Sequence, residues 1–106
     1  MMEGFIDTTA AVSNETRIHI LAFLQKHGRS CVCELEHSLV MGQARLSTNL
    51  AILKKAGFVS VEREGKWAYY ALAPKTPLHT QLLEAISALH VKVPCKVDAC
   101  VIKGEG

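Results

Sequence analysis

The hydrophobic period of this chain changes near Gly57, and that change restricts the folds it can adopt. Before Gly57, apolar residues recur at helical spacing. After it, residues 58–64 and 66–72 are rich in Val, Trp and Tyr, and a turn at Gly65 joins them, which is a hairpin signal. We therefore expect a helical domain that carries a small β-hairpin late in its sequence.

Capping residues divide the helical part. Ser13 is a suitable N-cap and Gly28 a suitable stop for a first helix. A second helix is expected from about Cys31 to about Leu39, followed by a short turn at residues 40–42. A third helix begins near Gln43 and ends at Gly57. Its apolar stripe, at positions i, i+4 and i+7, consists of Leu46, Leu50 and Leu53.

A last helix follows the hairpin. Thr76 is the expected N-cap, with Pro77 in the first turn and Pro94 as the stop. Its apolar stripe consists of Leu78, Leu82, Ala85, Ile86 and Leu89. The order helix, helix, turn, helix, hairpin, helix predicts a winged helix-turn-helix domain, a mainly α fold with a small β-hairpin (α+β). We assign this domain to residues 1–93 and a cysteine-containing tail to residues 94–106.

Composition limits the class of protein. The chain has 106 residues, of which 49% are hydrophobic, so one globular domain is expected. No stretch reaches the roughly 18 apolar residues of a membrane span. The N-terminus also lacks the basic and apolar regions of a signal peptide. We therefore expect a cytoplasmic protein with no membrane partner and with reduced cysteines.

The third helix is the expected DNA-reading helix, because the second helix of a helix-turn-helix enters the major groove. The net charge of +2 is weak evidence. However, no acidic residue lies between Glu36 and Glu62, while Arg45, Lys54 and Lys55 do. The residues expected to bond bases or phosphates of operator double-stranded DNA are Gln43, Arg45, Ser47, Thr48 and Asn49, with Arg63 and Lys66 at the hairpin tip. The alternative is that these are ordinary solvated polar faces.

Cys31 and Cys33 are a poor disulfide pair and a good start to a soft-metal site, since thiolates select soft or borderline ions. A helix N-terminus favours the thiolate form. Residues i and i+2 of a regular helix point about 200° apart. Both sulfurs therefore reach one ion only if Cys31 precedes the helix or the first turn is distorted. The alternative is that both are small buried apolar residues.

Taken together, these segments resemble the ArsR/SmtB family of metal-sensing bacterial repressors over about residues 11–73. The resemblance rests on Asn14-Glu15-Thr16-Arg17-Ile18-His19-Ile20-Leu21, Cys31-Val32-Cys33-Glu34-Leu35, Gln43 to Leu50 with Leu53, Ala56-Gly57-Phe58-Val59, and Arg63 to Leu72. It implies a homodimer built from the first and last helices. It also implies operator DNA that is bound without inducer and released when a metal or metalloid binds.

The resemblance also suggests the inducer. Cys31 and Cys33 match a segment typical of arsenic/antimony and cadmium/lead sensors. In one arsenic-sensing branch a third Cys follows three residues later, where this chain has Glu36. A third sulfur would then come from Cys95 or Cys100, of the same subunit or of the partner. The alternative is that the tail cysteines are incidental or pair with each other on oxidation. Three sulfurs suit As(III) or Sb(III), and four suit Cd(II), Pb(II) or Zn(II). We favour As(III), because the four-sulfur branch draws further cysteines from an N-terminal extension not seen here.

Two histidines on the last helix offer an alternative metal site. His79 and His90 match the middle of a zinc-sensor pattern, but Pro77 and Val93 replace its ends, so both histidines are expected on the helix surface. A thiol redox or persulfide switch on the same fold remains open, as does a metal-binding module without a DNA role. No catalytic set emerges, so an enzyme is not expected.

Overall fold

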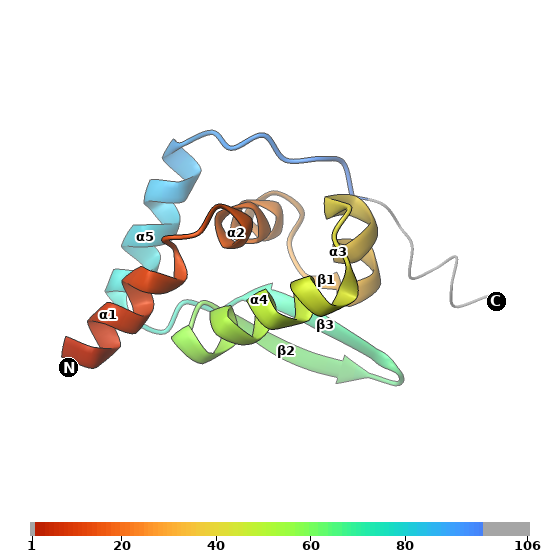
Figure 1. The fold of residues 1–106 in the computed structure, drawn as a ribbon, viewed down its shortest axis with the longest axis horizontal. Coiled ribbons are helices and arrows are strands. Elements are labelled where there is room, and N and C mark those ends of the chain that lie inside the picture. The colour runs from red at the N-terminus through yellow and green to blue at the C-terminus, as the bar shows by residue number, and fades with distance from the viewer. Residues whose placement is uncertain (1, 97–106) are drawn as a thin grey trace.

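Five helices and a small antiparallel sheet make up the computed structural model, which describes residues 2–96 (Figure 1). The helices are α1 (Met2–Ala11), α2 (Glu15–His27), α3 (Val32–Leu39), α4 (Gln43–Ala56) and α5 (Pro77–Ala88). The strands are β1 (Ser30–Cys31), β2 (Val59–Glu64) and β3 (Trp67–Leu72), in the order β1-β3-β2. Val61 faces Tyr70 in the hairpin, and Cys31 faces Tyr69 across the other edge of β3. The predicted order of helices and hairpin is confirmed.

The helix ends follow the capping residues, with one shift. Asn14, and not Ser13, is the N-cap of α2, because its Oδ1 accepts a backbone N–H at 3.1 Å. Gly28 ends α2 with φ of 77°, and Gly57 ends α4 with φ of 92°. These are backbone conformations that side chains with a Cβ rarely adopt. Thr76 caps α5 and a proline occupies its first turn, as predicted.

Three features differ from the sequence expectation. Helix α1 was not predicted, because it buries only Thr8 and Ala11 and so has no apolar stripe that faces the core. Strand β1 has two residues and depends on pairing with β3, a contact between distant segments that leaves no local pattern. Helix α5 ends at Ala88, well before Pro94, and His90 then takes a φ of 52°.

The core lies between α2, α3, α4 and the sheet. Its fully buried large apolar side chains are Phe23, Phe58, Ile20, Leu21, Leu24, Leu35, Leu46, Leu50 and Leu53. On α5, Leu83 and Ile86 are buried, while Leu89 is 62% exposed and Leu82 only half-buried. Within the predicted apolar stripe of α5, Ile86 is therefore part of the core, Leu78 and Leu82 are half-buried, and Ala85 and Leu89 are exposed. Leu83, which lies outside that stripe, also packs inward.

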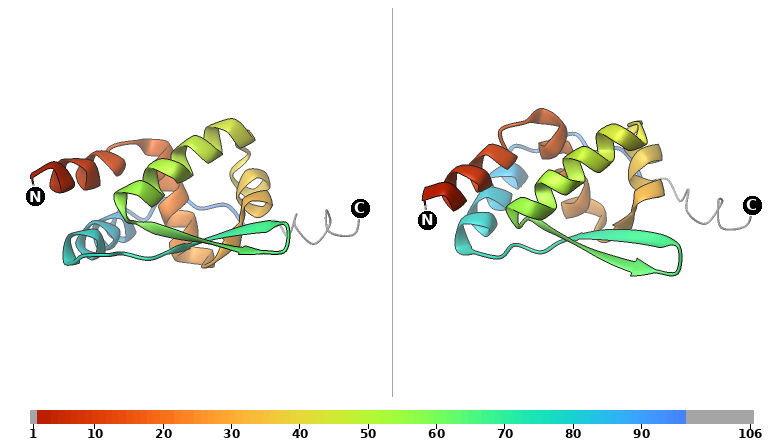
Figure 2. Two further views of the ribbon diagram at one scale, coloured as in Figure 1. Left: turned by 90° about the horizontal axis from the view of Figure 1, so that it is seen from below. Right: turned by 60° about the horizontal axis from the view of Figure 1, so that its bottom comes forward.

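The two ends of the molecule carry different elements. Helices α1 and α5 lie at one end and the hairpin tip at the other (Figures 1 and 2). Helix α4 and the hairpin diverge from the point where α4 ends and run toward the same end (Figure 2). Within residues 2–96, each helix is too short or too polar to cross a membrane.

Candidate functional site

The outer face of α4 is polar and contains no acidic residue. Buried Leu46 and Leu50 hold the opposite face against the core. The exposed polar side chains of its N-terminal half are Gln43, Arg45, Ser47 and Thr48, and Ala44 is exposed among them. Asn49, expected with them, is only half-exposed. The outward direction of the first group agrees with the sequence pattern, and their contact with DNA stays a prediction.

Two of these side chains already bond to the protein. Arg45 donates from Nη2 to Thr16 Oγ1 at 2.7 Å, which ties the start of α4 to the start of α2. Thr48 donates to the carbonyl oxygen of Ala44 at 2.9 Å. A guanidinium has five N–H donors, so one bond to Thr16 leaves Arg45 with donors for a base or a phosphate.

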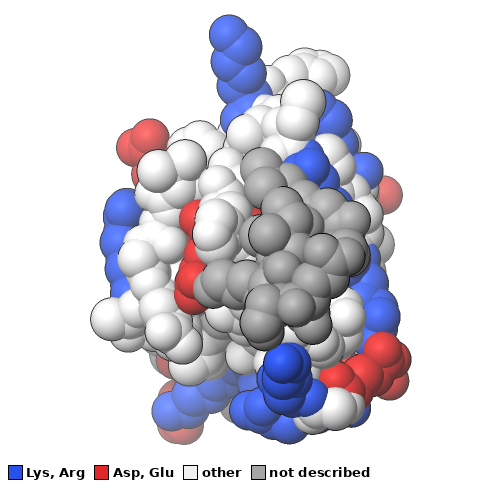
Figure 3. All heavy atoms as spheres, turned by 90° about the vertical axis from the view of Figure 1, so that its right-hand side faces the viewer, with Lys and Arg blue, Asp and Glu red and all other residues white. Residues whose placement is uncertain are grey.

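The hairpin presents a second group of cations. Arg63 and Lys66 are exposed beside the turn at Gly65, where φ is 62°. Their acidic neighbours Glu62 and Glu64 pair with Arg29. Viewed from the end that carries the hairpin tip, Lys and Arg side chains lie around the margin of the molecule, with acidic groups among them (Figure 3). These cations can contact a DNA backbone. Because acidic groups lie among them, the basic surface is small and confined to the hairpin tip.

Cys31 satisfies the geometric condition for sharing an ion with Cys33. Helix α3 begins at Val32, and Cys31 is its N-cap, with extended φ and ψ of −84° and 162°. Glu34 closes this end of the helix, since its Oε1 accepts the N–H of Cys31 at 2.9 Å. Cys31 is fully buried beside β3 and Cys33 is half-buried. The two thiols therefore do not sit on opposite sides of a regular helix.

The oxidation state of the cysteines differs along the chain. Cys31 is disulfide-bonded in this structure. Cys33 and Cys95 are the free cysteines among residues 2–96, and Cys100 lies outside those residues. Within the same residues, no three His, Cys, Asp or Glu side chains stand close enough to hold a metal ion. A complete three-sulfur site thus needs a reduced Cys31 and a contribution from the tail.

The segment after α5 crosses over to α3 of the same chain (Figure 1). His27 Nε2 lies 2.9 Å from the carbonyl oxygen of Pro94. Lys96 donates to the carbonyl oxygen of Arg29 at 3.1 Å, and its Nζ stands 3.7 Å from Glu34 Oε1. Cys95 lies between these two anchored positions. Sequence reasoning missed these anchors, because His27, Glu34 and Lys96 match no ligand pattern.

The histidines have structural rather than ligand positions. His79 is 5% exposed, and its ring nitrogens lie 2.7 Å from Thr76 Oγ1 and 2.6 Å from the carbonyl oxygen of Ala56. The expectation of a surface histidine is wrong here, because both ring nitrogens find partners inside the fold. His90 is exposed, as expected.

Comparison with known proteins agrees with this geometry. A model of bacterial regulatory proteins of the arsR family matches residues 14–61. The chain is 38% identical over 66 residues to the arsenic resistance transcriptional regulator ArsR1 of Pseudomonas putida, covering 62% of this chain and 52% of that protein. It is 36% identical over 66 residues to the arsenical resistance operon repressor of Escherichia coli, covering 62% of this chain and 56% of that protein. The chain thus spans about half the length of these relatives.

A further relative and a solved structure extend the match. ArsR2 of Pseudomonas putida, also an arsenic resistance transcriptional regulator, is 34% identical over 84 residues, with 77% of this chain and 73% of that protein covered. A homodimeric winged helix-turn-helix DNA-binding domain from Mycobacterium bovis superposes with a TM-score of 0.72 at 26% identity, covering 84% of this chain and 80% of that one. These proteins are named as regulators or DNA-binding domains, which agrees with the expectation that the chain is not an enzyme. The fold is a winged helix-turn-helix, and the chain belongs to the ArsR family of bacterial regulatory proteins.

Proposed function

We propose that this chain is a homodimeric repressor that binds operator DNA and leaves it when As(III) or Sb(III) binds to cysteine thiolates. Residues 1–93 form the DNA-binding and dimerisation domain, and residues 94–106 form a tail that supplies sulfur. The observation that carries the proposal is the contact of Lys96, the neighbour of Cys95, with the Cys31 end of α3, the helix that residues 40–42 join to the exposed polar helix α4.

DNA binding rests on two neighbouring elements. Helix α4 offers donors and acceptors for base edges, and the hairpin tip offers cations for the phosphate backbone. The proposed contacts are Gln43, Arg45, Ser47, Thr48 and Asn49 on α4, with Arg63 and Lys66 on the hairpin. Because the cations are few and acidic groups stand among them, the affinity should come from specific contacts together with a modest salt-dependent term.

The inducer site is proposed to close within one chain. Cys31 and Cys33 supply two sulfurs from the start of α3, and Cys95 or Cys100 supplies the third. The bonds of Lys96 and of the Pro94 carbonyl anchor Cys95 on this side of its own domain. Three sulfurs in a pyramid suit As(III), whereas Cd(II), Pb(II) or Zn(II) would require a fourth ligand.

Release follows from the position of this site. Helix α3 connects to α4 through residues 40–42, so a tail sulfur that pulls on the start of α3 shifts its packing against α4. In a dimer, that shift alters the spacing of the two DNA-reading helices. The inducer needs only a higher affinity for the released arrangement, and a coupling of about 1–3 kcal/mol lowers DNA affinity about 5- to 150-fold.

The test begins with a duplex selected by the wild-type chain from a random-sequence library. Binding of that labelled duplex is followed by anisotropy while sodium arsenite is added in a phosphine reductant. We expect Cys33→Ser to bind the duplex like wild type but not to release it. We expect one of Cys95→Ser and Cys100→Ser to lose release by arsenite. The other should still release the duplex and is the matched control. Failure to select any duplex, or release of Cys33→Ser at the wild-type arsenite concentration, contradicts the proposal.

A thiol redox switch is the second candidate, and the disulfide at Cys31 favours it. In that case peroxide would oxidise two thiols to a disulfide and be reduced to two waters, with loss of DNA binding. The same duplex is therefore titrated with hydrogen peroxide, and the protein mass is followed. Release by peroxide with a loss of two hydrogens, and none by arsenite, would replace the metalloid proposal. Release by Cd(II) or Zn(II) alone would assign a different ion.

A further inference from the structure

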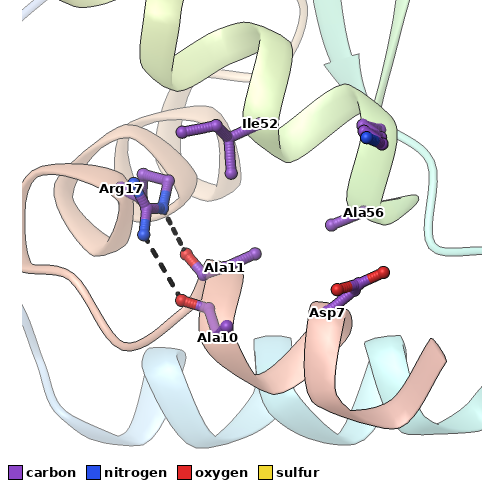
Figure 4. Close-up of a pocket in the computed structure, with 7 residues that line it drawn as sticks. Asp7, Ala10, Ala11, Arg17, Ile52 and Ala56 are labelled. Atoms are coloured by element: carbon purple, nitrogen blue, oxygen red, sulfur yellow. Dashed lines mark hydrogen bonds between the residues drawn. The ribbon is translucent and has the colours of Figure 1, made fainter. Parts of the chain in front are cut away.

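Arg17 links the end of α1 to the middle of α4. Its Nε donates to the carbonyl oxygen of Ala11 at 2.7 Å, and its Nη2 donates to that of Ala10 at 3.3 Å (Figure 4). Its remaining terminal nitrogen, Nη1, donates to Asn49 Oδ1 at 3.1 Å. A single half-buried side chain at the start of α2 thus holds two other helices.

The charge of Arg17 suits this position. The last carbonyl groups of a helix lack intrahelical partners and carry partial negative charge. Helix α1 has no basic residue in its own last turn. Arg17 supplies the cation from the next helix and bonds two of those carbonyls, and such charge-assisted bonds are stronger than neutral ones.

Asn49 is occupied on both sides of its amide. Its Oδ1 accepts from Arg17, and its Nδ2 donates to the carbonyl oxygen of Arg45 at 2.9 Å. The Arg17 guanidinium can only donate, so the Asn49 amide oxygen must face it. The Arg45 carbonyl can only accept, so the amide nitrogen must face that carbonyl. The reversed orientation would lose both bonds, so the amide is fixed. In this arrangement each polar end of the side chain already has one bond to the protein, and the half-buried amide keeps one N–H and one lone pair in a fixed direction.

Because α1 and α4 are not closely packed against each other beside Arg17, the Arg17 hydrogen bonds contribute much of the connection between them. A half-open cavity of about 210 Å³ separates parts of α1 and α4, with Asp7, Ile52 and Ala56 on its walls (Figure 4). Apolar contact between the two helices is therefore incomplete. A second bond between α2 and α4 joins Arg45 to Thr16. It lies one helical turn before Asn49.

We propose that Arg17 and Asn49 are positioning residues, which fix the DNA-reading helix α4 relative to α1 and α2, and that Asn49 does not read a base. This revises the role of Asn49 and adds Arg17. The inference rests on the DNA-binding part of the proposed function. Because Arg17 bonds to both α1 and α4, the link also transmits the placement of α1 to α4.

The test is a double-mutant cycle of Arg17→Met, Asn49→Ala and both together. Affinity for the duplex selected by wild type is measured by anisotropy across a salt series. The folded fraction of each variant is measured by circular dichroism. Lys26→Met is the matched control, because it removes an exposed cation from the other end of α2. Arg17→Lys keeps the charge but cannot span three acceptors.

We expect each single variant to weaken binding about tenfold, because both remove the charge-assisted bond from Arg17 to Asn49, and the double variant to be no weaker than Arg17→Met. Arg17→Lys should be weakened similarly, Lys26→Met should bind like wild type, and the salt slope should not change.

Three results overturn the inference. Losses that multiply to about a hundredfold would make Arg17 and Asn49 independent contacts. A salt slope reduced by about one would make Arg17 a phosphate contact. Wild-type affinity in folded Asn49→Ala would leave Asn49 without a role. A wild-type chain that binds no duplex contradicts the proposed function instead.

Discussion

His79 is a polar residue that the fold buries without leaving a ring nitrogen unpaired. The carbonyl oxygen of Ala56 can only accept, so Nε2 carries the proton that it shares at 2.6 Å. The other nitrogen then accepts from the hydroxyl of Thr76. The ring also meets Phe58 edge-on, with centroids 4.7 Å apart. A Cβ at Gly57 would stand 2.9 Å from Nε2, so a glycine there makes room for the ring.

Replacing His79 with Ala is expected to lower the free energy of unfolding by about 2–3 kcal/mol, because it leaves a cavity and an unpaired carbonyl at the end of α4. His79→Gln should lose less, since its amide N–H can reach the Ala56 carbonyl. Urea unfolding followed by circular dichroism gives the values. His37→Ala, at an exposed position of α3, is the control and should change stability little. Equal losses for Ala and Gln would assign the stability to packing alone.

At the scale of elements, the turn between α3 and α4 contains an unfavourable residue. Val40 ends α3 with φ and ψ of 51° and 57°, a left-handed conformation that disfavours β-branched side chains. Its side chain is 88% exposed, so packing does not compensate. The turn joins the proposed inducer helix to the proposed DNA-reading helix, and it therefore keeps its shape only because the flanking helices are well packed.

Val40→Gly is expected to stabilise the fold by about 1 kcal/mol, since release of the left-handed strain exceeds the added entropy of the unfolded chain. Val40→Ala should gain less, because it keeps a Cβ in the same conformation. The measurement is the midpoint of urea unfolding for the three proteins. A loss of stability in Val40→Gly would show that the turn is not strained in solution.

The sequence predicts elements well where their signals are local. The Leu46, Leu50 and Leu53 stripe, the Gly57 stop and the alternating hairpin all correspond to observed elements. It fails where the signal is a contact between distant segments. Strand β1 exists through its pairing with β3, and the core face of α5 is chosen by what packs against it. Helix α1 buries too little to show a core period.

The same distinction applies to the candidate site. Side-chain exposure on α4 could be reasoned from spacing, which for Cys31 gave only the condition that it precede its helix. The Arg17–Asn49 bond could not, because it joins residues from different helices. Nor could the return of Lys96 to Glu34, since nothing in the tail has a regular period. Sequence spacing identifies candidate ligands and the outward face of a helix. Hydrogen bonds between distant residues determine which of those side chains already have a partner within the protein.

At the scale of the whole molecule, α1 and α5 lie at the same end (Figure 1), and apolar side chains on α1 and just after α5 remain exposed. Met2, Phe5 and Ile6 on α1 are 76%, 56% and 54% exposed, and Leu89 just after α5 is 62% exposed. Exposed apolar groups gathered at one end mark an interaction surface more often than scattered ones do. We propose that the two chains of the homodimer meet there, through the first and last helices, which leaves both hairpins directed outward.

Phe5→Glu is expected to separate the dimer, because it places a charge in the apolar contact, and sedimentation velocity should then show the mass of one chain. Val40→Glu is the control for the mass measurement, since it places the same charge on a more exposed apolar side chain, at the end of α3. Separation of the dimer into single chains should also weaken binding of the selected duplex by about a hundredfold or more, because the two DNA-reading helices are then no longer tethered to each other. A Phe5→Glu protein that keeps the wild-type mass, or a wild type that is monomeric at micromolar concentration, would place the interface elsewhere or remove it.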